Sequence, residues 1–167
     1  SGILAVRCQG PTCDVTGMDM LSIPLQPTNA TLEGILDTPN PIALARWITA
    51  EQRYALFSPT DGIAADPSFN TVQAGQGFWI VSPLESTIAP SGRLVDQHSP
   101  FTIPVSAGWQ QIGSPFLSSI NWADVQVRYN GVTYTLAQSR QYGIVMDYAW
   151  EFVKVDGQSG YALVHST

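Results

Sequence analysis

The feature that most limits the fold of this chain is a series of short apolar runs, each ended by proline, glycine or another turn residue. The runs are rich in valine, isoleucine, threonine and aromatic residues and have a period of two, which is typical of strands. They are segments 20–25, 54–57, 78–81, 101–105, 125–129, 132–136, 150–155 and 161–164. Asn130-Gly131 lies between two of them and predicts a tight hairpin. The sequence therefore predicts an all-β domain, either a β-sandwich or a flattened barrel.

Helical patterns are scarce. Pro41 to Gln52 is the one segment with helical composition and a proline at its start, so we expect a short helix there, with a further turn at Thr31 to Leu36. The alternation of strands and long helices that characterises α/β enzymes does not occur in the sequence. At most one short helix is therefore expected.

An internal repeat suggests how the strands are organised. Gly17 to Leu25 and Gly108 to Phe116 share their glycine, proline and apolar positions at a constant offset, and Gly75 to Val81 resembles Gly157 to Val164 once one residue is inserted. The repeat predicts an N-terminal segment over 1–16, a first copy over 17–100 and a shorter second copy over 101–167. Because one copy alone would bury little surface, we expect the two to form one compact domain.

The repeated motif also carries a family resemblance. Gly108 to Phe116, followed by Ile120-Asn121-Trp122, resembles the "GWNLIGNPF…IDW" start of repeats in bacterial secreted and cell-surface proteins, and Gly75 to Val81 is similar to their "GQGFWV" strand. The resemblance implies a β module of a larger extracellular protein, without common catalytic residues. This chain departs from the family in its short second copy and in the cysteine segment that precedes the first.

The charge of the chain narrows the choice of partners. Charged residues make up 12% of the sequence, and 7 Lys+Arg are scattered singly among 13 Asp+Glu. Phosphate recognition needs clustered basic residues, so nucleic acid and anionic membranes are not expected partners. No apolar run approaches the length of a membrane-spanning helix, so membrane insertion is not expected either. Since the chain begins Ser1-Gly2-Ile3 without methionine, we expect a mature or excised product that has lost any signal peptide.

The N-terminal segment holds both cysteines, Cys8 and Cys13, separated by a Gly10-Pro11 turn signal. A structural disulfide is expected, which would suit an extracellular location. The alternative of a redox or metal pair lacks the two-residue spacer of the first and the four ligands of the second. Ser1 to Arg7 favours a strand and could cover an unpaired edge of the shorter copy, within the chain or in a neighbouring subunit.

Catalytic constellations are poorly represented. His98 and His165 are expected at the surface, because neither lies near a nucleophile motif and no third metal ligand is evident. Asp147 and Glu151 are the best acidic pair for glycoside hydrolysis. The sequence thus predicts no enzyme, cofactor or metal site, and a glycoside hydrolase is the least favoured reading.

Aromatic residues are the remaining resource for binding, because flat rings with a polar edge suit the apolar faces of sugars. Trp109, Phe78 and Tyr161 occupy repeat positions and are expected in the core, and Trp79 alternates with Phe78, so that one of the two could face outward. Residues outside the repeat pattern are the candidates for ligand binding: Trp47, Trp122, Tyr148 and Trp150.

Two functions follow from these features. The first is a non-catalytic extracellular module that binds polysaccharide or a surface glycan. The alternative is a structural subunit or repeat of an adhesin, surface layer or filament, with other copies of itself as partners through the N-terminal strand.

Overall fold

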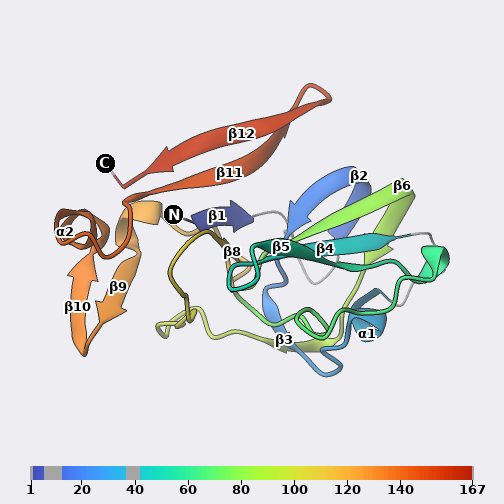
Figure 1. Cartoon of the computed structure of the whole chain (residues 1–167), viewed down its shortest axis with the longest axis horizontal. Helices are drawn as coiled ribbons and strands as arrows, with labels where there is room; N and C mark the ends of the chain where they lie inside the picture. Colours follow the sequence, from blue (N-terminus) through green and yellow to red (C-terminus); the bar gives the residue numbers. More distant parts are fainter. Residues whose placement is uncertain (1, 6–12, 37–41, 167) are drawn as a thin grey trace.

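The computed structural model describes residues 2–5, 13–36 and 42–166, and strands dominate this part of the chain (Figure 1). The strands are β1 (Gly2–Ala5), β2 (Cys13–Leu21), β3 (Leu25–Pro27), β4 (Ala43–Ile48), β5 (Arg53–Phe57), β6 (Phe78–Ile88), β7 (Gly92–Leu94), β8 (Gln110–Gly113), β9 (Gln126–Tyr129), β10 (Val132–Thr135), β11 (Tyr148–Val155) and β12 (Gln158–His165). The short helices are α1 (Leu32–Leu36) and α2 (Leu136–Gln141), with 3₁₀ turns η1 (Pro59–Asp61) and η2 (Trp122–Asp124). The predicted all-β fold is confirmed, and the sheets do not form a closed barrel.

The first sheet has the strand order β2-β6-β4-β5, with every neighbouring pair antiparallel. Its pairing is interrupted in β2 by an irregularity between Val15 and Gly17. A bulge of this kind bends an edge strand. The boundary expected between residues 16 and 17 therefore falls inside a strand.

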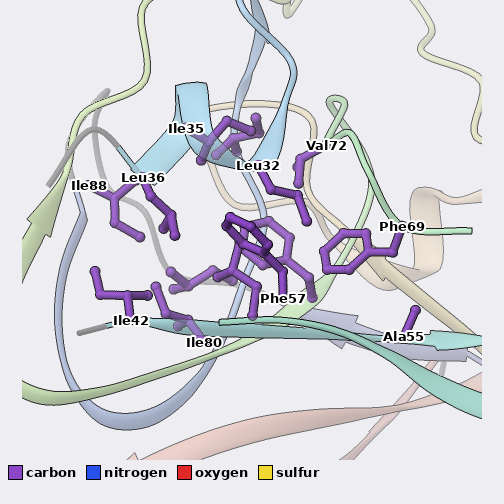
Figure 2. Packing of buried hydrophobic residues seen from close by; sticks show 14 of the residues in the cluster. Leu32, Ile35, Leu36, Ile42, Ala55, Phe57, Phe69, Val72, Ile80 and Ile88 are labelled. Atoms are coloured by element: carbon purple, nitrogen blue, oxygen red, sulfur yellow. The ribbon is translucent and has the colours of Figure 1, made fainter. Parts of the chain in front are cut away.

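The main core lies between one face of this sheet and α1, as Figure 2 shows. The helix begins after Thr31, whose Oγ1 accepts a hydrogen bond of 3.1 Å from the Gly34 N–H, a usual way of capping a helix. Leu32 and Ile35 then point toward the sheet, where Ile80 is fully buried. The turn expected over 31–36 is confirmed as a short helix, and it closes the apolar face of the sheet.

The helix expected over 41–52 is wrong, because residues 43–48 form β4 in the interior of the first sheet. Leu44 faces the main core, whereas Ala45 packs with Met20 and Trp79 in a second cluster. Backbone pairing with β5 and β6 on either side outweighs the helical propensity of this alanine-rich segment.

The second sheet has the order β12-β11-β1-β8. β11 and β12 form a long antiparallel hairpin, and β1 lies between β11 and β8, parallel to both. The N-terminal strand is therefore paired within the chain. One face of the hairpin packs through Ala149 and Val164 on a third cluster, which includes Trp122, Leu136 and Ile112.

Two short antiparallel ribbons complete the described fold. β3 pairs with β7, and β9 pairs with β10 through the predicted hairpin. Asn130 and Gly131 both have positive φ there, 49° and 82°, as a type I′ turn requires. After β10, Thr135 and Gln138 form a capping box that begins α2.

The two larger sheets meet at the segment that leads into β6. The Gly77 N–H donates to the Gln111 carbonyl and the Gly113 N–H to the Gly75 carbonyl, both at 3.1 Å. Gly75 has φ +80°, and a Cβ there would lie 2.8 Å from Ile103, so only glycine suits this crossing. This junction fixes the first sheet against the second.

The second sequence echo does not correspond to the structure. Gly75 to Val81 leads into β6 at the centre of the first sheet, whereas Gly157 to Val164 contains most of β12 at the edge of the second. The counterpart of β12 is the edge strand β5. Tyr54-Ala55-Leu56 of β5 matches Tyr161-Ala162-Leu163 of β12, a similarity too short to prevail over the glycine pattern in the sequence.

The expected disulfide lies outside the described residues, because Cys8 is not among them. Within the described ranges, none of the helices is long and apolar enough to cross a membrane.

Candidate functional site: an aromatic cluster between the sheets

The face of the first sheet opposite α1 is almost wholly apolar. Strand alternation and pairing put the following side chains on it: Met18 and Met20 of β2, Trp79 and Val81 of β6, Ala45 and Trp47 of β4, and Tyr54 and Leu56 of β5. An antiparallel sheet with two apolar faces needs cover on both. The β11–β12 hairpin supplies part of that cover.

Five aromatic rings lie on this face and on the hairpin that packs against it, in two groups of contacting rings. Trp79 contacts Phe152 edge-on at 4.9 Å between ring centroids and Tyr161 at 6.4 Å, and Phe152 and Tyr161 are 5.7 Å apart. Trp47 and Tyr54 form a second T-shaped pair at 5.2 Å. These five residues are called the aromatic cluster below. Edge-to-face geometry at such distances is favourable beyond the burial of area.

The cluster has a buried side and an open side. Trp79 and Phe152 are 7% and 5% exposed, whereas Tyr54 and Tyr161 are 45% and 53% exposed. Leu56 and Leu163, two residues further along the same strands, are also exposed. The two edge strands therefore present aromatic and aliphatic surface to solvent next to a rigid interior.

The pKa of Tyr161 reflects both its burial and its surroundings. Partial burial raises the pKa of Tyr161, and the nearby Tyr54 phenol raises it further. Because the folded pKa lies above the ordinary value of about 10, neutral Tyr161 contributes stability that is present below that value. This contribution is lost as the pH rises through the raised pKa.

Replacing Tyr54 with phenylalanine should lower the pKa of Tyr161 toward its ordinary value, yet leave it raised, because burial is the larger cause. The measurement is an alkaline titration of the Tyr161 ring signal by NMR. Tyr129→Phe, which removes an exposed hydroxyl from β9, is the matched control and should leave the titration unchanged. An unaltered Tyr161 pKa in Tyr54→Phe would contradict the proximity of the two phenols.

Three of the four residues predicted to bind ligand lie on the facing surfaces of the two sheets. Trp47 belongs to the aromatic cluster. Tyr148 and Trp150 are half-buried and precede Phe152 on the same face of β11, where the Tyr148 ring lies 6.3 Å from that of His165. Strand alternation thus brings these predicted residues to one region, although none of them is widely exposed.

Trp122, the fourth residue predicted to bind ligand, does not join this region, since it is 8% exposed and belongs to the third core cluster. Its Nε1 donates a hydrogen bond of 3.1 Å to the Asp147 carbonyl. Asn121 caps η2 by accepting from the Ala123 N–H, which turns Trp122 inward. The ring supports the base of the β11–β12 hairpin and is closed to ligands.

Two residues assigned to the core by the repeat pattern are exposed instead. Trp109 is 44% exposed because it precedes β8, and Tyr161 lies on the edge strand β12. Phe78 is buried as expected. Trp79 does face the opposite side, but the hairpin covers it, so neither residue of that alternating pair is open to solvent.

The remaining candidates from the sequence are the two histidines and the acidic pair considered for catalysis. His98 and His165 are exposed, as expected. Asp147 is buried and forms an ion pair with Arg140, at 3.1 Å between the nitrogen and oxygen atoms. Glu151 lies on the opposite face of β11 from Trp150. Among the described residues, no group of three potential metal ligands gathers.

Sequence reasoning missed Tyr54, the main partner of Trp47. The available signal was the shared Tyr-Ala-Leu of residues 54–56 and 161–163, which marks the two hairpin edges that meet. Comparisons of the chain with protein-family models, with curated proteins and with solved structures gave no match.

Proposed function

We propose that this chain is a non-catalytic extracellular module that binds a polysaccharide or surface glycan through the open side of the aromatic cluster. The observation that carries the proposal is the pair Tyr54 and Tyr161, both about half exposed and held on paired strands. Each phenol offers a flat face to sugar C–H groups and a hydroxyl for hydrogen bonding.

The surroundings of the pair suit a neutral ligand. Leu56 and Leu163 extend the apolar surface along the two strands. Arg53, at the start of β5, is held by Glu51 and Asp66, so its charge is balanced locally. A surface of rings and aliphatic groups with balanced charge favours sugars over phosphorylated ligands.

Retention on polysaccharide tests the proposal. The chain is incubated with insoluble cellulose and chitin and run by affinity electrophoresis through soluble β-glucan, xylan and starch. We expect retention on at least one glycan, and we expect Tyr54→Ala or Tyr161→Ala to weaken it by about tenfold, the loss of one stacking contact.

Tyr129→Ala is the matched control, since Tyr129 is 51% exposed on β9, outside the aromatic cluster. It should bind like the parent chain, and circular dichroism should report intact folding for all three variants. Equal retention of Tyr54→Ala, Tyr161→Ala and the parent chain would contradict the assigned surface, and no retention on any glycan would contradict the ligand class.

A second function, a structural subunit that assembles with other chains, is favoured by one observation. β1 pairs along both of its edges within the second sheet. A short strand held between two others through main-chain pairing can be replaced by the same strand of another copy, as in assembly by strand exchange.

A further inference from the structure

The two larger sheets have equivalent strand orders, except at one position. β2 and β8, which carry the sequence repeat, each end a sheet, and the hairpins β4–β5 and β11–β12 each form its other side. Between them lies β6 in the first sheet and β1 in the second. The position between β8 and β11 is called the slot below.

In the first sheet, the central strand contributes a tryptophan to the interface between the sheets. Trp79 of β6 lies between Met20 of β2 and Ala45 of β4 in one row. Its ring packs on Phe152 and Tyr161 of the other sheet. β6 is 11 residues long and antiparallel to both neighbours.

In the second sheet, the equivalent row contains Gln111, Ile3 and Trp150. Ile3 thus occupies the row position that Trp79 occupies in the first sheet. β1, however, has only 4 residues and is parallel to both neighbours. It pairs with β11 along Ala149–Glu151 alone, which is less than half of that strand. β1 therefore fills the slot incompletely and in the opposite direction from β6.

The contacts across the interface correspond as well. Trp47 and Tyr54 occupy the hairpin positions of Phe152 and Tyr161, each pair being opposite in register. Phe152 is 5% exposed beneath Trp79, but Trp47 is only half-buried, and Tyr54 is its one ring contact among the described side chains. The equivalent of Trp79 is what the Trp47–Tyr54 pair lacks.

A polar group near the slot also lacks a partner. Gln111, in the same row as Ile3, accepts a hydrogen bond of 2.6 Å from the Trp47 N–H. Its Nε2 is buried without a hydrogen-bond partner in the part of the chain described. A buried unpaired donor is costly, so the slot as β1 fills it leaves a polar group unsatisfied.

Apart from Gln111, both sides of the slot are apolar. On one side lies the interface with the first sheet, and on the other lies the third cluster, with Ile112 of β8 and Ala149 of β11. A strand buried on both faces needs a continuous apolar run rather than an alternating one. Phe78-Trp79-Ile80-Val81 of β6 is such a run.

We propose that the slot between β8 and β11 is a strand-acceptor site for a partner polypeptide, which enters antiparallel to both strands with a Gly-aromatic-Trp-aliphatic segment like that of β6, and that β1 is an exchangeable occupant. The tryptophan of the entering strand packs on Trp47 and Tyr54, as Trp79 packs on Phe152 and Tyr161. Main-chain pairing on both edges supplies affinity, and the two apolar faces supply specificity. The inference is independent of the glycan proposal.

The test uses the full chain and a fluorescent synthetic peptide with the sequence of residues 74–82. Binding is followed by anisotropy, and hydrogen exchange is measured with and without peptide. We expect saturable binding of one peptide per chain, faster amide exchange in residues 2–5 and retained protection in β8 and β11. A peptide of reversed sequence and one with asparagine in place of Trp79 are the controls, and neither should bind.

Ile3→Pro sharpens the test, because proline cannot donate to the ladder of a central strand. As the open slot becomes more populated, the apparent affinity for the peptide should rise by about tenfold or more. Exchange in the parent chain keeps the test decisive should this variant fail to fold. Equal binding of the reversed peptide would overturn the proposed orientation, and absence of binding to both chains would overturn the site. Dimerisation of Ile3→Pro without peptide binding would overturn the partner site in favour of strand exchange between copies of this chain. Glycan retention is measured on the same chains, and retention that stays unchanged would show that a failure of the slot proposal is not a failure of the glycan surface.

Discussion

Replacing Trp79 with alanine is expected to lower the free energy of unfolding by about 3–5 kcal/mol, the usual cost of deleting a buried large aromatic side chain. Trp79 lies near the start of the interior strand β6, packs with Met20 and Ala45 in its own sheet, and contacts Phe152 and Tyr161 in the other. Its loss removes the ring contacts of β6 with the β11–β12 hairpin. Chemical denaturation followed by far-ultraviolet circular dichroism measures the change.

Tyr142→Ala is the control for that measurement. Tyr142 is 66% exposed beyond the end of α2, and its removal should change stability by less than about 1 kcal/mol. A Trp79→Ala chain as stable as this control would mean that the hairpin does not depend on the aromatic cluster. Because Phe152 and Tyr161 lose a neighbouring ring, near-ultraviolet circular dichroism should also change more in Trp79→Ala than in Tyr142→Ala, which removes a single ring contact with Tyr134.

Trp122→Ala is expected to be similarly destabilising, by about 3–5 kcal/mol, because the side chain fills the third cluster beneath β11. Trp122→Phe keeps a ring but removes the donor to the Asp147 carbonyl, and should cost less, of the order of 1–3 kcal/mol. Thermal unfolding of the two variants alongside the parent chain measures both effects.

The two variants, Trp122→Ala and Trp122→Phe, distinguish a core role for Trp122 from a role in ligand contact. A core residue gives a graded loss of stability and leaves glycan retention by the folded Trp122→Phe chain unchanged. Loss of glycan retention in a Trp122→Phe chain of parental stability would restore the residue to the binding surface and contradict its place in the core.

Most strands were predictable because their period-two pattern and turn residues are local, but the strand expected over 101–105 is wrong, since no strand lies between β7 and β8 in the described chain. Asn130-Gly131 needs only its own backbone preferences to form a hairpin, and the structure confirms it. Residues 43–48 were mispredicted because their alanines favour helix locally, while pairing with β5 and β6 from distant parts of the chain decides the outcome.

For the aromatic residues too, local sequence predicts one property and the arrangement of the sheets decides another. Alternation placed Tyr148, Trp150 and Phe152 on one face of β11, which is a local property. Whether a ring on that face is covered depends on which strands become edges and which sheet lies opposite. Tyr161 is exposed because β12 ends its sheet, and Trp122 is buried because η2 turns it inward. Neither circumstance is encoded near the residue concerned.

The position of β1 has a consequence for the order of folding. Its partners lie at Gln110–Gly113 and Ala149–Glu151, so this strand pairs with strands that are synthesised much later than itself. The first sheet, from β2 to β6, can pair while the rest of the chain is still being synthesised. Contacts that close such long loops form slowly. During that interval β8 and β11 have open edges, and any extended segment nearby competes with β1 for them.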